Sequence, residues 1–198
     1  MDFEAVVRSR RMCRDFLDRP VPRSTVEGII DVARRAPSAG HAQGREFLVL
    51  EGDETSRLWD LALPAGDRSS FRWPGLLEAP VLVLPTVSQK AYLRRYSQPD
   101  KAGSGLGESA ESWRVPYWYV DGGCAVMTML LAACAAGLGA LFFGLFDNEQ
   151  AVAEGLGIPP EHQPLGVVAL GYPASETPSR STARQRPALE ELIHRGEW

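Results

Sequence analysis

The sequence predicts a single domain of the α+β class. Stretches with apolar residues at helical spacing alternate with short apolar segments of strand length, as at 81–84 and 165–170. Residues 118–136 are apolar almost without interruption, which predicts a helix buried on every side. The chain has 198 residues, a usual length for one domain with a substantial core. We therefore expect one domain over residues 1–198.

The composition excludes several classes of function. Apolar residues make up 44% of the chain and charged residues 23%, and the net charge of -4 gives no basic field for nucleic acid. Three cysteines without a CxxC pair indicate a reducing compartment and no disulfides. The most apolar stretch, 122–144, is interrupted by glycines, which favours a buried helix and strand over a membrane span. We expect a cytoplasmic protein without nucleic-acid or membrane partners.

The chain begins with a short helix and a group of arginines. Residues 2–9 carry apolar side chains at helical spacing, and the arginines crowd together at Arg8, Arg10, Arg11 and Arg14. Four guanidinium groups this close repel one another unless they are solvated or face an anion. A solvated basic surface and a site for an anionic ligand group such as phosphate are both consistent with the pattern.

A helix, a loop and a strand come next. Ser24 and Glu27 form an S-x-x-E capping box for a helix that continues to Ala36. The following loop, APSAGHAQGREF at 36–47, is rich in small residues. Its backbone either approaches a ligand closely or only ends the helix. A short buried strand is predicted at 47–50.

A helix at 54–63 and a strand at 81–84 precede a long segment without periodicity at 89–116. This segment has aromatic residues at its two ends and Gly and Ser in its middle, so it is either a lid over a site or a partly disordered excursion. We expect a lid-like insertion here.

The last part of the chain predicts two strands and two helices. The strands lie at 140–143 and 165–170, and a capped helix runs from Asp147 to Leu156 between them. A polar arm at 172–198 follows, with a terminal helix near 189–194.

The usual catalytic signatures are missing from the sequence. It has no GxSxG elbow, no P-loop and no complete GxGxxG. The histidines lie far apart at His41, His162 and His194, without an HxxxH or Cys/His partner, so we expect no metal. Two arginine clusters, a small-residue loop and an aromatic segment remain. They suit an anionic, planar cofactor that carries the chemistry itself.

Four motifs occur in an order typical of one enzyme family. They are RRMCRDF (10–16), PSAGHAQGREF (37–47), GLGALFFGLFD (137–147) and RQRP (184–187). In this order they resemble the motifs of the nitroreductase superfamily of FMN enzymes. The resemblance covers nearly the whole chain.

The first motif resembles R-R/H-S-x-R/K-x-F, whose basic residues contact the FMN phosphate and pyrimidine. The resemblance assigns Arg10, Arg11 and Arg14 to these contacts and places Met12 where the family usually has Ser. Arg72 matches a family position beside the flavin pyrimidine.

The second motif resembles P-S-x-x-N-x-Q-P-W-x-F, which lies against the isoalloxazine across a dimer interface. The resemblance assigns flavin contacts to Pro37, Ser38, Ala39 and Gln43. His41 replaces the common Asn, and Gly44 with Arg45 replaces Pro-Trp.

The remaining motifs resemble the G-L-G-x-x-x-x-G strand near flavin N5 and the closing K/R-x-R-x-P. They assign Gly144 and Leu145 to the flavin edge, and Arg184 and Arg186 to the phosphate. The middle of the chain is most similar to actinobacterial-type members with a long lid. From the aromatic segment and the departure at His41, we expect an acceptor pocket among His41, Tyr92, Tyr96 and Trp113.

The resemblance implies a three-layer sandwich with a central, mainly antiparallel sheet and a long buried helix at a homodimer interface. It implies hydride transfer from NAD(P)H through flavin N5 to a nitroarene, quinone or enone, with ping-pong kinetics and no catalytic side chain. Two alternatives stay open. One is a specialised flavin enzyme of the same superfamily, of reductive dehalogenase or flavin-fragmenting type, and the other is a flavin-binding protein without turnover.

Overall fold

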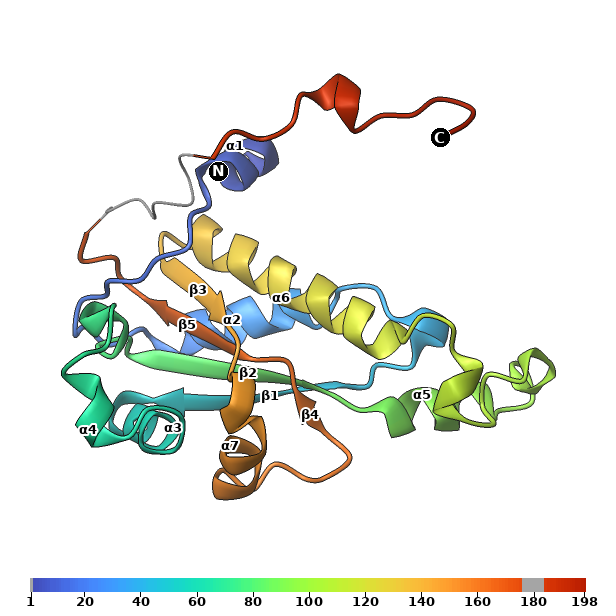
Figure 1. Ribbon diagram of the computed structural model, residues 1–198, viewed down its shortest axis with the longest axis horizontal. Coiled ribbons are helices and arrows are strands. Elements are labelled where there is room, and N and C mark those ends of the chain that lie inside the picture. The colour runs from blue at the N-terminus through green and yellow to red at the C-terminus, as the bar shows by residue number, and fades with distance from the viewer. Residues whose placement is uncertain (1, 176–183) are drawn as a thin grey trace.

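The computed structural model describes residues 2–175 and 184–198, which form a sheet between two layers of helices (Figure 1). The helices are α1 (Phe3–Ser9), α2 (Arg23–Ala33), α3 (Thr55–Ala62), α4 (Ala65–Arg68), α5 (Gln89–Tyr96), α6 (Tyr117–Ala135) and α7 (Glu149–Gly155). The strands are β1 (Arg45–Glu51), β2 (Val81–Val87), β3 (Gly139–Phe143), β4 (Gln163–Pro164) and β5 (Val167–Gly171). The predicted α+β sandwich is confirmed.

The sheet is antiparallel throughout its named strands. Its order is β1-β2-β5-β3, and the short β4 pairs with the end of β2. The amino-terminal segment adds a parallel bridge from Met12 to Ala140 on β3. The segment with the arginines is therefore fixed to the edge of the sheet.

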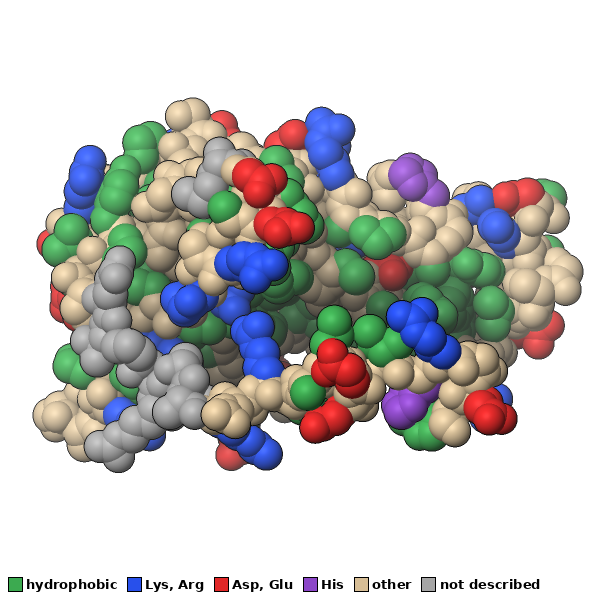
Figure 2. Space-filling model, turned by 90° about the horizontal axis from the view of Figure 1, so that it is seen from above, with side chains coloured by type: hydrophobic (Ala, Val, Ile, Leu, Met, Phe, Trp, Pro, Cys, Tyr) green, Lys and Arg blue, Asp and Glu red, His purple; other side chains and the backbone are tan. Residues whose placement is uncertain are grey.

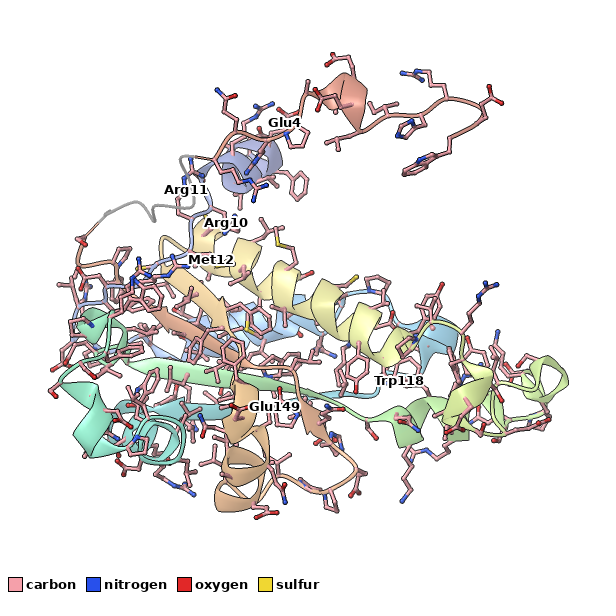
Figure 3. All side chains as sticks on the ribbon, viewed as in Figure 1. Glu4, Arg10, Arg11, Met12, Trp118 and Glu149 are labelled. Atoms are coloured by element: carbon pink, nitrogen blue, oxygen red, sulfur yellow. The ribbon has the colours of Figure 1, made fainter. Side chains whose placement is uncertain are left out.

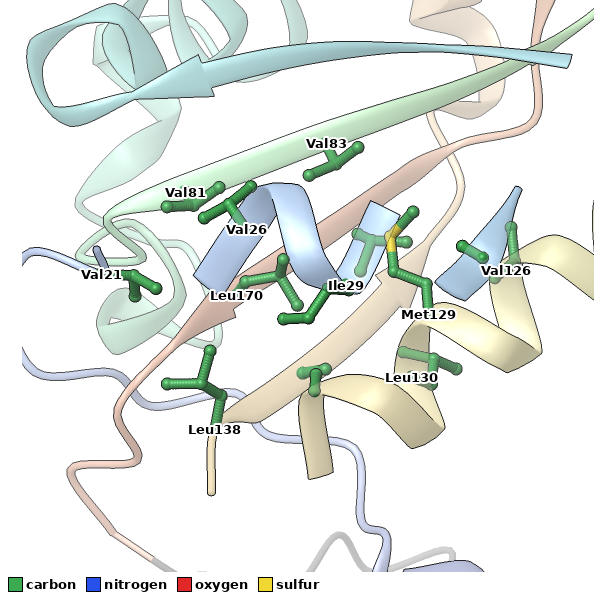
Figure 4. Close-up of a cluster of buried hydrophobic side chains, with 14 residues drawn as sticks. Val21, Val26, Ile29, Val81, Val83, Val126, Met129, Leu130, Leu138 and Leu170 are labelled. Atoms are coloured by element: carbon green, nitrogen blue, oxygen red, sulfur yellow. The ribbon is translucent and has the colours of Figure 1, made fainter. Parts of the chain in front are cut away.

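Both faces of the sheet are covered, which explains why its central strands β2 and β5 are almost continuous apolar runs. On β2, Val81 and Val83 face one core with α2 and α6, whereas Leu82 and Leu84 face a second core with α3 and α7. Figure 4 shows the first core, where Met129 of α6 meets the sheet and α2. In the second core Trp59 of α3 stacks on Phe143 of β3, with ring centroids 5.7 Å apart.

Within one chain helix α6 is buried on one side only, so the predicted burial on every side would need a second chain. Its buried face includes Gly122, where a side chain would meet Leu165 and Val87 of the sheet layer. Its other face exposes Val120 and Met127 by 45% and 41%. In the described part of the chain α6 is the one helix long and apolar enough to cross a membrane, a test that core helices of soluble proteins also pass.

Several predicted boundaries were wrong for local reasons. Helix α2 begins two residues earlier than a helix capped by Ser24 would, because the Pro22 carbonyl accepts the first N–H groups, from Thr25 at 2.8 Å and Val26 at 3.3 Å. Ser24 therefore lies inside the helix, and the capping-box interpretation was wrong. A capping box does occur before α3, between Glu51 and Glu54.

The 89–116 segment and the arm at 172–198 were the hardest parts of the chain to predict, and they differ in structure. Residues 89–116 fold into α5 and two short helical turns, and no part of this range is outside the described chain. In the arm, residues 176–183 lie outside the described residues, and the predicted terminal helix is a single turn at Leu189–Glu191. The described end of the arm extends away from the body of the molecule (Figure 1). An isolated turn without packing partners does not propagate into a helix.

Candidate functional site

The loop between α2 and β1 has an unusual backbone. Gly40, His41 and Gln43 adopt left-handed φ values of 59°, 57° and 52°. Two of them are not glycine, and for a residue with a Cβ the left-handed conformation is less favourable than the right-handed one by about 1–2 kcal/mol. The exposed side chains of His41 and Gln43 touch through their Nε2 atoms. The surrounding structure must hold this shape.

A buried carboxylate on α6 anchors the loop. Oδ2 of Asp121 accepts the N–H of Ala39 at 2.7 Å and the hydroxyl of Tyr92 at 2.6 Å. Ser38 Oγ accepts the N–H of Gln43 at 2.9 Å. Burial, followed by the bond to Asp121, raises the pKa of Tyr92 well above its usual value. The phenol therefore stays protonated and donates to the carboxylate at neutral pH.

Arg45 fixes the loop from its other end. Its guanidinium donates to the carbonyls of Pro37 at 2.7 Å, Ala36 at 2.8 Å and Asp121 at 3.1 Å. A planar group with five donors suits several carbonyls at once. Where the related motif has Trp, this chain uses a charged residue to tie the end of α2 to the first turns of α6.

Helix α5 of the 89–116 segment packs directly on the loop. A Cβ at Gly40 would lie 2.7 Å from the Tyr96 ring, and a Cβ at Gly44 would lie 2.8 Å from Ala91 Cβ. Arg95 donates to the Gly40 carbonyl at 2.7 Å and pairs with Asp100 at 2.7 Å, which holds the pKa of that carboxyl below its usual value. The loop and α5 form one packed unit.

The aromatic residues assigned to an acceptor pocket form the interior of this unit. Tyr92 is 0% exposed and Trp113 is 8% exposed. Trp113 meets Tyr96 edge to face at 4.7 Å between ring centroids and donates its indole N–H to the Leu106 carbonyl. Within one chain these rings contact protein, and their role toward an acceptor stays a prediction.

The arginine segment forms the second part of the site. Arg10 has a buried Nη1 atom with no hydrogen-bond partner among the described residues. Arg11 is exposed and donates to the carbonyls of Arg8 and Arg10, while Met12 lies on the sheet edge and packs against both cores. Figure 3 shows Arg10, Arg11 and Met12 on the stretch that joins α1 to the body. A buried guanidinium nitrogen without a partner offers a hydrogen-bond donor to an anion.

Arg14 and Arg72 both lie over the ring of Trp73, at 5.4 and 5.0 Å from its centroid. Arg14 also donates to the Met12 carbonyl at 3.2 Å. Both guanidinium groups therefore contact the same indole, and the assignment of both to one end of a flavin stays a prediction.

The turn after β3 carries another backbone outlier. Gly144 is half-buried and Leu145 is buried at 3% exposure, whereas Phe146 is 82% exposed and left-handed with φ 51°. The Phe146 ring lies over Gly144, where a Cβ would come within 3.4 Å of it. A strained, exposed aromatic is typical of a functional turn.

Arg184 and Arg186 are exposed on the described end of the arm. Figure 2 looks at the face that carries α1 and shows basic side chains gathered near its middle. Both arginines are accessible to a ligand or a second chain, and their assignment to the phosphate stays a prediction.

The two parts of the site lie at opposite ends of α6. The loop is bonded to Asp121 in the first turns of α6. Met12 pairs with Ala140, which lies beyond Ala135, the last residue of α6. Figure 3 shows the same separation between Trp118 and the arginine segment. From Asp121 to Ala135 a helix rises about 20 Å. One chain therefore does not bring both parts to one flavin ring.

In residues 2–175 and 184–198 no group of three His, Cys, Asp or Glu residues is placed to hold a metal ion. His162 is engaged with Thr86 at 3.2 Å and with Glu46 at 3.5 Å. The arrangement instead fits an anionic cofactor, because the orphaned Arg10 nitrogen offers a buried donor for it.

Comparison with known proteins identifies the class. The model of the Nitroreductase family matches residues 7–172, and the chain belongs to this family. It is therefore an oxidoreductase, and the fold predicted from the four motifs is the fold of its solved relatives.

Two curated relatives show the range of names in the family. A 4-nitrobenzoate reductase from Nocardioides sp. is 28% identical over 96% of this chain and 88% of its own length. A protein of Archaeoglobus fulgidus named as an NADH dehydrogenase/NAD(P)H nitroreductase is 28% identical over 98% of this chain and 97% of its own.

Solved structures agree on the fold. A nitroreductase family protein from Clostridium difficile superposes with a TM-score of 0.72 at 22% identity over 100% of both chains. A nitroreductase from B. subtilis gives a TM-score of 0.74 at 20% identity, over 98% of this chain and 74% of its own.

Three residues of the site were not assigned to it from the sequence. Asp121 is a charged residue in an otherwise apolar helix. This alone could have indicated its role, because a buried charge needs hydrogen-bond partners. Arg45 was noted only as a departure from the motif. Phe146 gave no signal, because its left-handed backbone is not a property of the residue type.

Proposed function

We propose that this protein is an FMN-dependent NAD(P)H oxidoreductase. The observation that carries the proposal is the buried, unpartnered Nη1 of Arg10 within a segment of four arginines. The chemistry that FMN supplies is hydride acceptance at N5 from NAD(P)H and reduction of an electron-poor acceptor, with ping-pong kinetics. Three unpaired cysteines agree with a protein of the reducing cytoplasm.

Each part of the chain has a defined task in this proposal. Arg10 and Arg11, joined by Arg184 and Arg186 of the arm, bind phosphate, and each charge-assisted bond contributes about 1.5–3 kcal/mol. Arg14, together with Arg72, places positive charge at the pyrimidine end, where negative charge develops on reduction. The flavin edge meets the backbone of Gly144 and Leu145, and the 37–43 loop covers the ring.

The proposed active form is a homodimer in which each site takes the arginines from one chain and the loop from the other. The separation of these parts along α6 supports it, as does the apolar groove of about 410 Å³ on this helix. The groove is lined by Tyr119, Gly123, Val126, Met127, Leu130, Phe142 and Leu165. A second copy would cover this surface.

For the acceptor we propose a nitroarene, with quinones and enones as further members of the class. The 4-nitrobenzoate reductase among the relatives favours an aromatic nitro group over the other acceptors. 4-Nitrobenzoate is therefore the first acceptor to assay, beside a halotyrosine for the dehalogenase alternative and reduced flavin with oxygen for the fragmenting one.

The cofactor is tested on purified protein. We expect a yellow protein that releases FMN on denaturation and whose flavin absorbance is bleached by NADH or NADPH. A colourless protein that gains no flavin spectrum on titration with FMN contradicts the proposal. Bound flavin that neither nucleotide bleaches indicates a binding protein without turnover.

The shared site is tested by mixing two defective chains. Arg10→Glu removes the phosphate site, and Gln43→Trp blocks the exposed side of the loop. Each homodimer should lose activity, whereas a mixture refolded together should regain it, because a heterodimer has one intact site. Absence of rescue, or a monomer in sedimentation at micromolar concentration, contradicts the dimeric site.

A further inference from the structure

Asp121 is the one carboxylate that the described part of the chain buries, with 5% exposure in an otherwise apolar helix. A buried charge is unfavourable unless several groups bond to it. A neutral residue would fit the helix better, so the position serves something other than the packing of α6.

The carboxylate joins three elements that are distant in the sequence. A single oxygen, Oδ2, accepts from Ala39 in the loop and from Tyr92 in α5. Ala39 immediately precedes the left-handed Gly40 and His41. The bond therefore acts on the residue from which the unusual backbone starts.

The other contacts of α5 act on the same stretch. Arg95 donates to the Gly40 carbonyl, and the Tyr96 ring covers Gly40. Arg45 donates to the Asp121 carbonyl and so fixes the same turn of α6. Left-handed residues return to the right-handed region unless contacts of this kind hold them.

We propose that Asp121 and Tyr92 are positioning residues for the acceptor. They hold the loop in the shape that presents His41 and Gln43, so α5 controls acceptor affinity through the loop and not by touching the acceptor. This inference rests on the proposed function. It also accounts for a tyrosine with no exposed surface in a segment whose aromatic residues the sequence placed in a pocket.

The competing explanation is that the network only stabilises the fold. In that case its loss lowers the free energy of unfolding but leaves acceptor KM unchanged in the molecules that remain folded. A rise in acceptor KM at nearly constant kcat distinguishes the positioning role from the purely stabilising one. A misplaced loop weakens binding of the acceptor but does not change the reduced flavin that donates the electrons.

The test compares Asp121→Ala, Asp121→Asn and Tyr92→Phe with Ser97→Ala in the FMN-saturated enzyme. Ser97 lies in the same segment, and among the described residues its hydroxyl donates to two carbonyls of that segment, Leu93 at 2.9 Å and Gly107 at 3.2 Å. With 4-nitrobenzoate as acceptor, Asp121→Ala should raise KM about tenfold and change kcat less than about twofold. Tyr92→Phe should raise KM about threefold, since one of two bonds is lost.

Asp121→Asn keeps an acceptor oxygen and should restore part of the affinity, while Ser97→Ala should match the wild type. An unchanged KM in a folded Asp121→Ala or Tyr92→Phe enzyme overturns the proposal, as does an equal rise in Ser97→Ala. If Asp121→Ala does not fold, the isosteric Tyr92→Phe decides.

A second measurement does not depend on flavin. In the apoprotein, amide hydrogen exchange of residues 36–45 should become faster in Asp121→Ala and Tyr92→Phe but not in Ser97→Ala. Unchanged protection there overturns the inference even if the enzyme binds FMN. A wild type that binds no FMN overturns the proposed function while this measurement still decides whether the network holds the loop.

Discussion

The 36–45 loop and the 8–14 segment both belong to the candidate site, but they differ in how far the chain itself satisfies their polar groups. In the loop, Arg45, Asp121 and Tyr92 direct their hydrogen bonds to protein atoms. In the segment, Arg10 keeps a buried donor without a partner among the described residues. The loop has its geometry before any ligand arrives, whereas the segment gains its missing bonds from the ligand.

The largest expected effect concerns the fit between the loop and α5. In Gly44→Ala the new Cβ would lie 2.8 Å from Ala91 Cβ and 2.9 Å from the Ser88 carbonyl oxygen. We expect a loss of about 2–3 kcal/mol in unfolding free energy, measured by urea denaturation. Gly28→Ala is the control, because nothing lies within 4 Å of its Cβ, and it should stabilise α2 by about 0.5–1 kcal/mol. Equal stability of the two variants would break the comparison.

Arg45→Met should cost about 2 kcal/mol of unfolding free energy, because it leaves four carbonyl contacts unmade. Arg45→Lys should recover only part, since an ammonium group cannot bond to carbonyls in several directions as a planar fork does. The control is Arg57→Met, at an exposed arginine on α3, which should change stability by less than about 0.5 kcal/mol. A loss in Arg57→Met as large as in Arg45→Met would show that the loop contacts are not special.

Unlike Arg45→Met, Arg10→Met should leave the stability of the apoprotein unchanged and lower the affinity for FMN. The apoprotein should keep its stability in urea, because the half-buried Arg10 side chain, whose buried Nη1 has no partner, is replaced by an apolar chain. FMN affinity should fall about tenfold, equal to about 1.4 kcal/mol, in calorimetric titration. If the apoprotein instead loses as much stability as in Arg45→Met, the segment is a structural element and the contrast fails.

The smallest effect is a dependence on alkaline pH. The folded state raises the pKa of Tyr92 above its usual value of 10.0, so the unfolded chain releases this proton first. The contribution of Tyr92 to the free energy of unfolding is therefore complete below pH 10. It is lost as pH rises, by about 1 kcal/mol at pH 11. Tyr92→Phe should lose less stability than the wild type between pH 9 and pH 11 in urea titrations. Parallel pH curves for the two proteins would contradict this assignment.

The fold was predictable from the sequence because both cores leave a local signal. Strand β2 is buried on both faces, and its run of apolar residues predicted a buried strand at 81–84, where the structure has Val81–Val87. Helix α6 was predicted within one residue at each end. Within one chain it is less buried than its composition indicates, because an apolar surface that a second chain could cover looks in sequence like a core.

The site was less predictable because its polar contacts join distant residues. The bond from Ala39 to Asp121 spans 82 positions, and that from Tyr92 to Asp121 spans 29. No spacing pattern marks such pairs. Aromatic residue type was also a poor guide to the acceptor pocket. Trp113 is of a type common in ligand pockets, but it is as buried as a core residue. The arginine segment was found because its residues are adjacent.

The close contact between Gly44 and α5 also bears on how this enzyme can be altered. Helix α5 fits only on a loop without side chains at positions 40 and 44, and the loop keeps its shape only with Arg95 and Tyr92 above it. The two stretches, nearly 50 positions apart, are thus a single exchangeable module. A graft of another family member's 89–116 segment would have to carry its own 36–45 loop with it.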